Sequence, residues 1–319
     1  MPHPTSPTPA RPVPLFTALA LVLATPPVGL HAVQLQGVGD PPAPGQRVIL
    51  VTGSTSGLGR EVARALAADG AHVILHGRSE DRAADLLDEI RNAGAGSARF
   101  YRADFAALDE VRALAEAVLR DYPRLDALVN NAGVLVVGDP ERQLSADGHE
   151  LHFQVNYLSG YLLTTLLLPR LRESAPARIV NVASVAQSPP DFDDLMLTRA
   201  YTTGRAYAQS KLAQILFTLD LAAALRGTGV TVNALHPSTF MDTNMVLGAG
   251  LEPRTSVETG RDAVLRLLDD PDPGTGRYFD VFESARAHDA AYDPEVRARL
   301  RAVSDALTGV DHRRWGEAH

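Results

Sequence analysis

The sequence predicts an α/β fold: a single Rossmann-type, doubly wound parallel sheet with helices on both faces. From residue 46 onward, short apolar runs alternate with segments of helical periodicity, which is typical of parallel strands joined by right-handed crossovers. A glycine-rich stretch separates the first apolar run from the first helical segment, where such folds bind a dinucleotide. The 319 residues are enough for one large domain with a substantial core.

The predicted strands are short and apolar, as burial on both faces requires. They are, in order, Val48–Val51, Val73–Leu75, Arg99–Tyr101, Leu125–Val129, Ala177–Ala183 and Val230–Leu235, with Tyr278–Val281 as a last candidate. The helices predicted between them are Leu58–Ala68, Asp81–Asn92, Leu108–Leu119, Gly148–Leu168 and Tyr207–Leu225. Gly70 and Gly94 follow two of these helices, in the position that glycine favours at a helix end.

Residues 1–45 differ in composition from the rest of the chain. They begin with a stretch rich in Pro, Ser and Thr, which is typical of disorder. The apolar run Leu15–Ala24 that follows is too short to span a bilayer. An unstructured extension, a signal peptide and a short membrane anchor all remain open. We therefore divide the chain into an extension (1–45), a folded domain (46–310) and a C-terminal tail (311–319).

The charge and the absence of cysteine exclude several classes of protein. The formal net charge of −8 argues against nucleic acid as a partner, because nucleic-acid-binding surfaces are basic. Without cysteine the chain has no disulfide framework, thiolate nucleophile or zinc ribbon. Only one of the 30 basic residues is a lysine, Lys211, which suggests a position where arginine cannot substitute. Arginine stays charged at any usable pH, whereas the pKa of a lysine ammonium can be tuned.

The glycine-rich stretch Thr52–Gly59 is a candidate phosphate-binding loop. Its glycines permit a tight turn and a close approach to a diphosphate, and the following helix offers free N–H groups. A plain strand-to-helix turn is the alternative interpretation. The residues expected to contact a cofactor here are Gly53, Ser54, Thr55, Ser56, Gly57, Leu58 and Gly59.

The end of the second predicted strand favours NADP over NAD. An acidic residue there would bond the ribose hydroxyls of NAD, but the sequence reads His-Gly-Arg-Ser. Arg78 can instead bind a 2′-phosphate with help from Ser79, although a solvated surface arginine is a competing interpretation. Asp104, after the third strand, is expected to accept a hydrogen bond from adenine or else to cap the helix at Leu108.

Four polar residues form a candidate catalytic group. Tyr207 and Lys211 are four residues apart on a predicted helix, so they share one face, and the ammonium can favour the phenolate. Ser184 follows the fifth strand, at the edge of the sheet that opens onto the ligand crevice. Asn156 is a polar residue among apolar neighbours in a long helix, where it needs a partner.

Together these motifs resemble the short-chain dehydrogenase/reductase family. They include the loop Thr52–Gly59 and, after the fourth strand, Asn130-Asn131-Ala132-Gly133. The resemblance implies that Tyr207 is the general acid/base and that Lys211 binds the nicotinamide ribose. It also implies that Ser184 orients the substrate oxygen and that Asn156 holds a water. Asn130, Ala132 and Gly133 are implied to contact the cofactor.

Within the family, the chain is most similar to the retinol-dehydrogenase-like branch. This implies NADP-preferring hydride transfer between the nicotinamide and an alcohol, aldehyde or ketone carbon of an apolar substrate. Pro237 and Thr243 match the segment that contacts the nicotinamide, although Thr243 lies one residue later than usual. We expect the segments 187–206 and 239–254 to shape the substrate site. A homodimer or homotetramer is implied through the two long helices.

Two other functions remain open: a non-catalytic NADP-binding sensor or scaffold on the same fold, and a different reaction such as epimerisation. We expect no metal site, and we interpret His149, Glu150 and His152 as a solvated helix start because the spacing is not H-E-x-x-H. A nicotinamide enzyme is expected in the cytoplasm, while membrane association or export through residues 1–45 is the alternative.

Overall fold

The core of the fold is one nine-stranded sheet in the order β1-β4-β3-β2-β5-β6-β7-β8-β9. The computed structural model describes residues 1, 35–136 and 141–316, and the residues from 35 onward lie in one unit. Strands β2 to β8 run parallel, whereas β1 and β9 pair antiparallel at the two edges. The strands are β1 (Val38–Gly39), β2 (Val48–Val51), β3 (His72–Gly77), β4 (Ser97–Arg102), β5 (Ala127–Asn130), β6 (Ala177–Val182), β7 (Val230–His236), β8 (Arg277–Asp280) and β9 (Glu283–Ala285).

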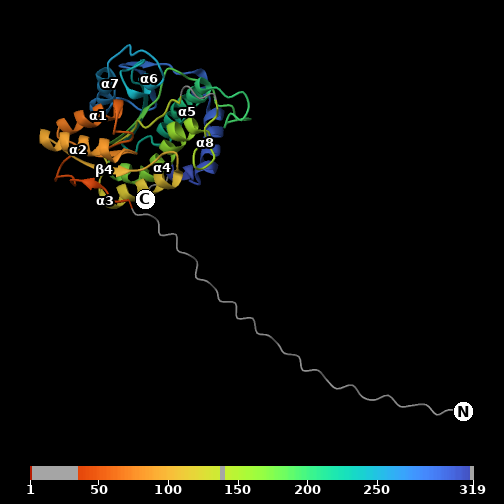
Figure 1. Ribbon diagram of the computed structural model, residues 1–319, viewed down its shortest axis with the longest axis horizontal. Helices are drawn as coiled ribbons and strands as arrows, with labels where there is room; N and C mark the ends of the chain where they lie inside the picture. Colours follow the sequence, from red (N-terminus) through yellow and green to blue (C-terminus); the bar gives the residue numbers. More distant parts are fainter. Residues whose placement is uncertain (2–34, 137–140, 317–319) are drawn as a thin grey trace. The chain divides into compact units, whose positions relative to one another are not determined.

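Helices cover both faces of this sheet (Figure 1). They are α1 (Gly57–Ala68), α2 (Glu80–Ala93), α3 (Leu108–Asp121), α4 (Ser159–Glu173), α5 (Thr203–Ala224), α6 (Asn244–Gly248), α7 (Val257–Asp269) and α8 (Pro294–Thr308). Residues of α1, α2 and α7 share one apolar core, and residues of α3, α4, α5 and α8 share the other. Along β2, Val48 and Leu50 belong to the second core, while Ile49 and Val51 belong to the first. The doubly wound prediction is confirmed.

The chain reverses the direction in which it adds strands between β2 and β5. After β2 it adds β3 and β4 on one side, then returns to place β5 on the other side. The crevice at the carboxyl ends of these two strands is where doubly wound folds bind ligands. Thr52–Gly59 follows β2 and Asn131–Gly133 follows β5, so both predicted cofactor segments meet at this switch point.

A π-helical segment, η1 (Phe153–Leu158), precedes α4 and was not predicted from the sequence. The sequence predicted one uniform helix over 148–168, whereas helical structure begins near Leu151 and continues to Glu173. A π-helical turn widens the helix by one residue and is often found at functional sites. Here it contains Asn156.

Helix α7 was also missed, although one of its faces is apolar and buried. Gly260 interrupts this face and lowers the helix propensity. The structure explains the glycine: a Cβ at this position would lie 2.4 Å from Met241 Sδ and 3.3 Å from Pro237 Cβ.

The boundaries of the folded region lie outside those expected at residues 46 and 310. Strand β1 pairs Val38 with Phe100 of β4, so the sheet begins earlier in the chain. At the other end, the 3₁₀ turn η3 (His312–Trp315) places Trp315 in the core, where its indole N–H donates to Thr165 Oγ1 over 3.2 Å.

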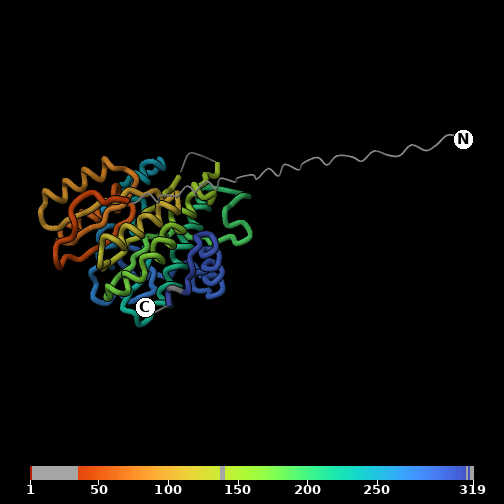
Figure 2. The backbone as a smooth tube through the Cα atoms, turned by 90° about the horizontal axis from the view of Figure 1, so that it is seen from below, coloured from red at the N-terminus to blue at the C-terminus, as the bar shows by residue number. Residues whose placement is uncertain are grey.

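Helix α8, although rich in arginine, packs against the rest of the domain. Figures 1 and 2 show α8, in blue, beside α5, in green. Leu300 and Ser304 of α8 are buried, and Ser304 Oγ lies 2.7 Å from the hydroxyl of Tyr157. One face of α4 and α5 is therefore covered by α8 and by Trp315 of the same chain.

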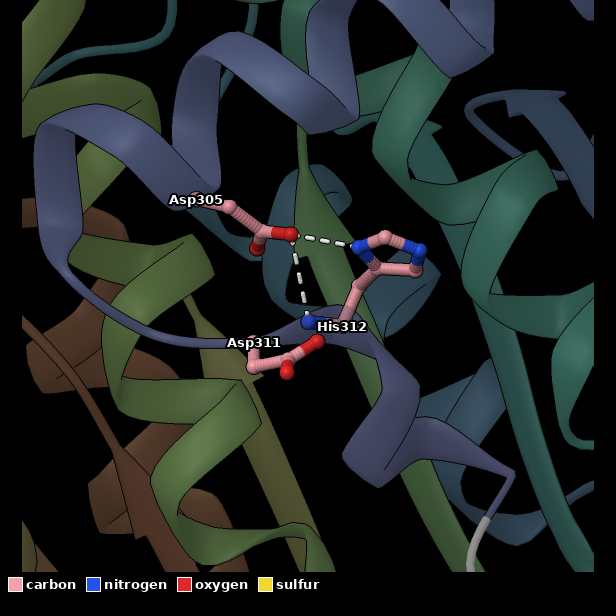
Figure 3. A group of neighbouring side chains, drawn as sticks. All are labelled: Asp305, Asp311 and His312. Atoms are coloured by element: carbon pink, nitrogen blue, oxygen red, sulfur yellow. Dashed lines mark hydrogen bonds and ion pairs between the residues drawn. The ribbon is translucent and has the colours of Figure 1, made fainter.

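Asp305, Asp311 and His312 gather where α8 ends (Figure 3). Asp305 accepts hydrogen bonds from the backbone N–H and the imidazole of His312, and from the hydroxyl of Tyr161 over 2.6 Å. Asp311 caps η3 and pairs with Arg313. Protein donors thus occupy both carboxylates, and the cluster joins the C-terminal segment to α4.

Across the described parts of the chain, we find no helix with the length and hydropathy needed to cross a membrane. The apolar run Leu15–Ala24, for which a signal or anchor was considered, lies outside the described residues.

Candidate active site

The loop between β2 and α1 requires glycine at several positions. Gly53 and Gly57 have φ of +65° and +53°, which side chains rarely tolerate. A Cβ on Gly59 would lie 2.3 Å from the carbonyl oxygen of Gly53. Ser56, the N-cap residue of α1, makes no side-chain hydrogen bond to the helix. The loop thus forms a tight backbone cradle with helix N–H groups facing it, which fits a diphosphate.

Asn131 locks this loop to the segment after β5. Its side-chain amide donates to the carbonyl oxygens of Thr52 and Gly53, over 2.9 and 3.2 Å. The hydroxyl of Thr52 in turn accepts from the backbone N–H groups of Asn131 and Ala132, each over 3.0 Å. Asn131 was not among the predicted cofactor contacts; its role is to hold the two cofactor segments together.

A buried histidine on β3, His76, supports the loop through hydrogen bonds. The sequence analysis did not predict this role. Gly53 N donates to His76 Nδ1 over 3.1 Å, so His76 Nε2 carries the proton and donates to the carbonyl oxygen of Ala103. Burial lowers the pKa of His76 to about 4, which keeps the ring neutral. Ser54 adds a further connection, since its hydroxyl accepts from His76 N over 2.9 Å. The sequence offered only one signal for this role, a histidine at the carboxyl end of an apolar strand.

The side chains predicted to select NADP lie together at the end of β3. Arg78 is exposed, and its guanidinium lies 3.8 Å from the Asp104 carboxylate. The Ser79 hydroxyl caps α2 by accepting from Arg82 N. The alternative role of Asp104, capping the helix at Leu108, is wrong. Asp104 accepts from Ala106 N instead, while Asp147 accepts from Leu108 N over 2.9 Å.

The structure brings three of the predicted catalytic residues to the ends of β6 and α5. Ser184 follows β6 and is buried, while Tyr207 is partly buried in the second turn of α5. Lys211 Nζ lies 5.6 Å from the centre of the Tyr207 ring and donates to the carbonyl oxygen of Val182 over 2.9 Å. Helix α5 begins at Thr203, one turn earlier than predicted, and presents Tyr207 and Lys211 on one face.

The two ionisable groups of this site have shifted pKa values. Burial lowers the pKa of Lys211 to about 7, and among the described residues no carboxylate compensates the buried charge. Burial also raises the pKa of Tyr207, an effect that a hydrogen bond with Ser184 opposes. In the chain alone, burial outweighs this hydrogen bond, and the expected lowering of the Tyr207 pKa by the lysine cation is not observed.

Asn156 anchors the segment after β5 rather than standing free. Its Oδ1 accepts from Val134 N over 2.7 Å, and its Nδ2 donates to Val134 O and to Ser210 Oγ. A Cβ on Gly133 would lie 3.3 Å from Asn156 Oδ1 and 3.6 Å from Lys211 Nζ. Gly133 therefore lies between the asparagine and the lysine, and its missing side chain leaves room beside both.

Asn130, in contrast, turns its side chain into the core. Its Nδ2 donates to Thr164 Oγ1 and to Asn181 Oδ1, over 2.9 and 2.8 Å. Asn181 continues this buried chain to Thr218 Oγ1. The predicted cofactor contact of Asn130 therefore does not come from its Nδ2.

The last predicted contacts come from the segment after β7. Thr243 lies beside the glycine loop, since a Cβ on Gly57 would be 3.4 Å from Thr243 Cβ. Pro237 packs near α7, as described above. The two segments predicted to shape the substrate site, 187–206 and 239–254, follow β6 and β7 at the carboxyl edge of the sheet. In one, Asp191 and Leu195 are bound to Gln209 of α5, and in the other Leu247 is exposed on α6.

The prediction of a solvated helix start at residues 149–152 is wrong. Glu150 and His152 are both 1% exposed, and His152 Nδ1 lies 2.8 Å from Glu150 Oε1. The ring of His152 meets the ring of Tyr207 edge-on, with the centroids 6.5 Å apart.

Comparisons with known proteins agree with this geometry. The model of the short chain dehydrogenase family matches residues 47–251. Human retinol dehydrogenase 14 is 36% identical over 314 residues, covering 89% of this chain and 92% of the relative. Human retinol dehydrogenase 13 is 38% identical over 84% of this chain and 86% of its own length.

Solved structures show the same fold. An uncharacterized protein from Mycobacterium paratuberculosis superposes with a TM-score of 0.70 at 29% identity, covering 85% of this chain and 97% of its own. A short chain dehydrogenase from Shigella flexneri, complexed with NADP, superposes with a TM-score of 0.62 at 28% identity, covering 74% and 97%. The chain therefore belongs to the short-chain dehydrogenase/reductase family, in the branch that resembles the retinol dehydrogenases.

Proposed function

We propose that this short-chain oxidoreductase transfers a hydride between NADP and the alcohol or carbonyl carbon of an apolar small molecule, with Tyr207 as general acid/base. The observation that carries the proposal is that Tyr207 lies beside both the Ser184 hydroxyl and the Lys211 ammonium, with Gly133 and Asn156 next to the lysine. A protein that only binds NADP needs neither a general acid/base at Tyr207 nor the Ser184 hydroxyl to orient a substrate oxygen. The retinol dehydrogenases among the relatives support an apolar substrate.

The nicotinamide, when bound, supplies or accepts the hydride. In reduction, the Ser184 hydroxyl donates to the substrate carbonyl oxygen and holds it beside Tyr207, which gives that oxygen a proton. Burial raises the pKa of Tyr207, so the phenol keeps its proton until the substrate oxygen takes it. With the cofactor bound, Lys211 would hold the ribose hydroxyls and would stabilise the phenolate that remains. The missing side chain of Gly133 leaves room for a relay water beside Asn156.

Replacing Tyr207 by Phe tests the mechanism directly. The variant keeps the ring and its packing but has no proton to transfer, so we expect kcat to fall at least about a thousandfold. NADPH affinity, measured by fluorescence titration, should change little. A panel of apolar aldehydes, ketones and alcohols with both cofactors provides the substrate. Full turnover by Y207F would overturn the mechanism, and NADPH binding without turnover of any substrate by the wild type would favour the sensor or scaffold.

The preference for NADP is assigned to Arg78. Its exposed guanidinium is free to approach a 2′-phosphate, and its nearest carboxylate, that of Asp104, is 3.8 Å away. Several structural relatives are complexes with NADP or NADPH, which supports this preference. Arg78→Ala should raise the KM for NADPH at least about tenfold, the cost of one charge-assisted contact, and leave the KM for NADH unchanged. An unchanged NADPH/NADH ratio would contradict this assignment.

A homodimer or homotetramer also remains a proposal. The two long helices that the resemblance assigns to the subunit contact are α4 and α5, and α8 with Trp315 covers one of their faces. We therefore place any subunit contact on another face of the chain. Sedimentation velocity of the wild-type protein determines the state. The cytoplasmic location, like the alternatives for residues 1–45, is tested by sequencing the mature N-terminus.

A further inference from the structure

Glu150 and His152 are a buried ionisable pair that the mechanism above does not use. Both side chains are 1% exposed, although they stand at the start of a helix where solvated polar groups are usual. Glu150 Oε1 accepts from His152 N, and Oε2 accepts from Phe153 N over 2.7 Å. The carboxylate therefore caps the helix while it also holds the imidazole.

The hydrogen bonds of His152 assign its tautomer. Val136 N donates to His152 Nε2 over 3.1 Å, so Nε2 is an acceptor without a proton. The proton is then on Nδ1, which donates to Glu150 Oε1 over 2.8 Å. The ring is neutral, and each of its nitrogen atoms has one partner: the carboxylate on one side and the backbone of the segment after β5 on the other.

His152 acts on the same segment as Asn156. Asn156 binds both backbone polar groups of Val134, and His152, one helical turn earlier, binds the N–H of Val136. This segment leaves the carboxyl end of β5, where doubly wound folds bind ligands. The His152 ring also stands perpendicular to the ring of Tyr207, at an interplanar angle of 89°. One imidazole thus contacts the wall of the crevice and the ring of the acid/base residue.

We propose that His152, oriented by Glu150, is a positioning residue that clamps the backbone at Val136 and thereby sets the substrate side of the crevice against Tyr207. Asn156 clamps the cofactor side of the same segment, next to Gly133 and Lys211. The inference rests on the proposed role of Tyr207 for its consequence in catalysis. The clamp itself is a property of the fold.

Two substitutions separate the two hydrogen bonds of this imidazole. In His152→Asn the amide lies where Nδ1 was, so it still reaches Glu150 but not Val136. In His152→Gln the amide extends to the place of Nε2, and its oxygen can accept from Val136 N. Both variants remove the aromatic ring and leave a polar group in the same site. They therefore form a matched pair: H152N keeps the bond to Glu150, and H152Q keeps the bond to Val136.

We expect H152N to raise the KM for an apolar aldehyde such as decanal about tenfold, because one buried hydrogen bond is lost. The Kd for NADPH should stay within about twofold of the wild-type value. H152Q should restore the KM to within about threefold. Amide hydrogen exchange, followed by NMR, should show Val136 losing protection in H152N and keeping it in H152Q. If the role of His152 were purely structural, the KM and the protection of Val136 would change alike in both variants, in parallel with their melting temperatures.

Equal KM values for the two variants, or an unchanged protection of Val136 in H152N, would overturn the proposal. The exchange measurement needs no turnover. If wild-type protein reduces no carbonyl compound, the proposed function fails, and loss of Val136 protection in H152N alone still supports the clamp.

Discussion

At the scale of single residues, Lys211 illustrates how a site can depend on the shape of a charged group as well as on its charge. The residue is 4% exposed, and its ammonium donates to the carbonyl oxygen of Val182 and lies near Gly133 and the ring of Tyr207. Burial lowers its pKa to about 7. A compact ammonium fits between these groups, whereas a planar guanidinium is larger and directs its donors differently. This accounts for one lysine in a chain that otherwise uses arginine.

Lys211→Arg should therefore impair turnover far more than folding. We expect kcat/KM to fall at least about a hundredfold, equivalent to about 2.7 kcal/mol of transition-state stabilisation. Steady-state kinetics and thermal unfolding followed by circular dichroism measure the two effects. A variant with near-normal kcat/KM would mean that the lone lysine is an accident of composition.

At the scale of elements, the β2–α1 loop depends on close backbone approaches that only glycine allows. A Cβ on Gly59 would lie 2.3 Å from Gly53 O and 2.4 Å from Asn131 Nδ2. The second contact would displace the amide that joins this loop to the segment after β5. Gly204, at the exposed start of α5, has no atom within 4 Å of an added Cβ and is a control within the same chain.

Gly59→Ala should destabilise the protein by about 1–3 kcal/mol, the usual cost of overpacking, and weaken NADPH binding at least about tenfold. Gly204→Ala should leave NADPH binding unchanged and keep or slightly raise stability, because alanine is the better helix former. Urea unfolding and fluorescence titration of both variants provide the comparison. Equal NADPH affinity in G59A and wild type would show that the loop tolerates the added methyl group.

At the scale of the whole molecule, two buried histidines of β3 make stability depend on pH. Burial lowers the pKa values of His72 and His76 to about 4, below the value of 6.5 for an exposed imidazole. Between these values the unfolded chain binds protons that the folded chain does not. The free energy of unfolding should therefore be at its full value above pH 6.5 and should decrease as the pH falls towards 4.

Each of these histidines should contribute a slope of up to about 1.4 kcal/mol per pH unit in this window. His72→Gln should flatten the slope, since glutamine does not titrate and can bond the hydroxyl of Ser97 that His72 contacts. Denaturant unfolding at a series of pH values measures it. A free energy of unfolding independent of pH between 4 and 6.5 would contradict the buried, neutral state of both rings.

Much of the site could be predicted because its signals are local. The glycines of Thr52–Gly59 follow directly from the turn they must make, and Tyr207 with Lys211 follows from the spacing of one helical turn. The carboxyl ends of parallel strands meet at one edge of the sheet, so Ser184 and Asp104, which each follow a predicted strand, could be placed at that edge.

The sequence by itself thus determined the family, the doubly wound sheet and the residues of the candidate catalytic group, because strand burial, glycine turns and helix spacing act over short stretches of chain. Only the tertiary structure decided where side chains without a local signal point. It turned Asn130 inward, placed His76 beneath Gly53, and buried Glu150 with His152 beside Tyr207. The partners of these side chains lie on other elements, and a buried polar group is determined by the donors and acceptors that packing brings to it.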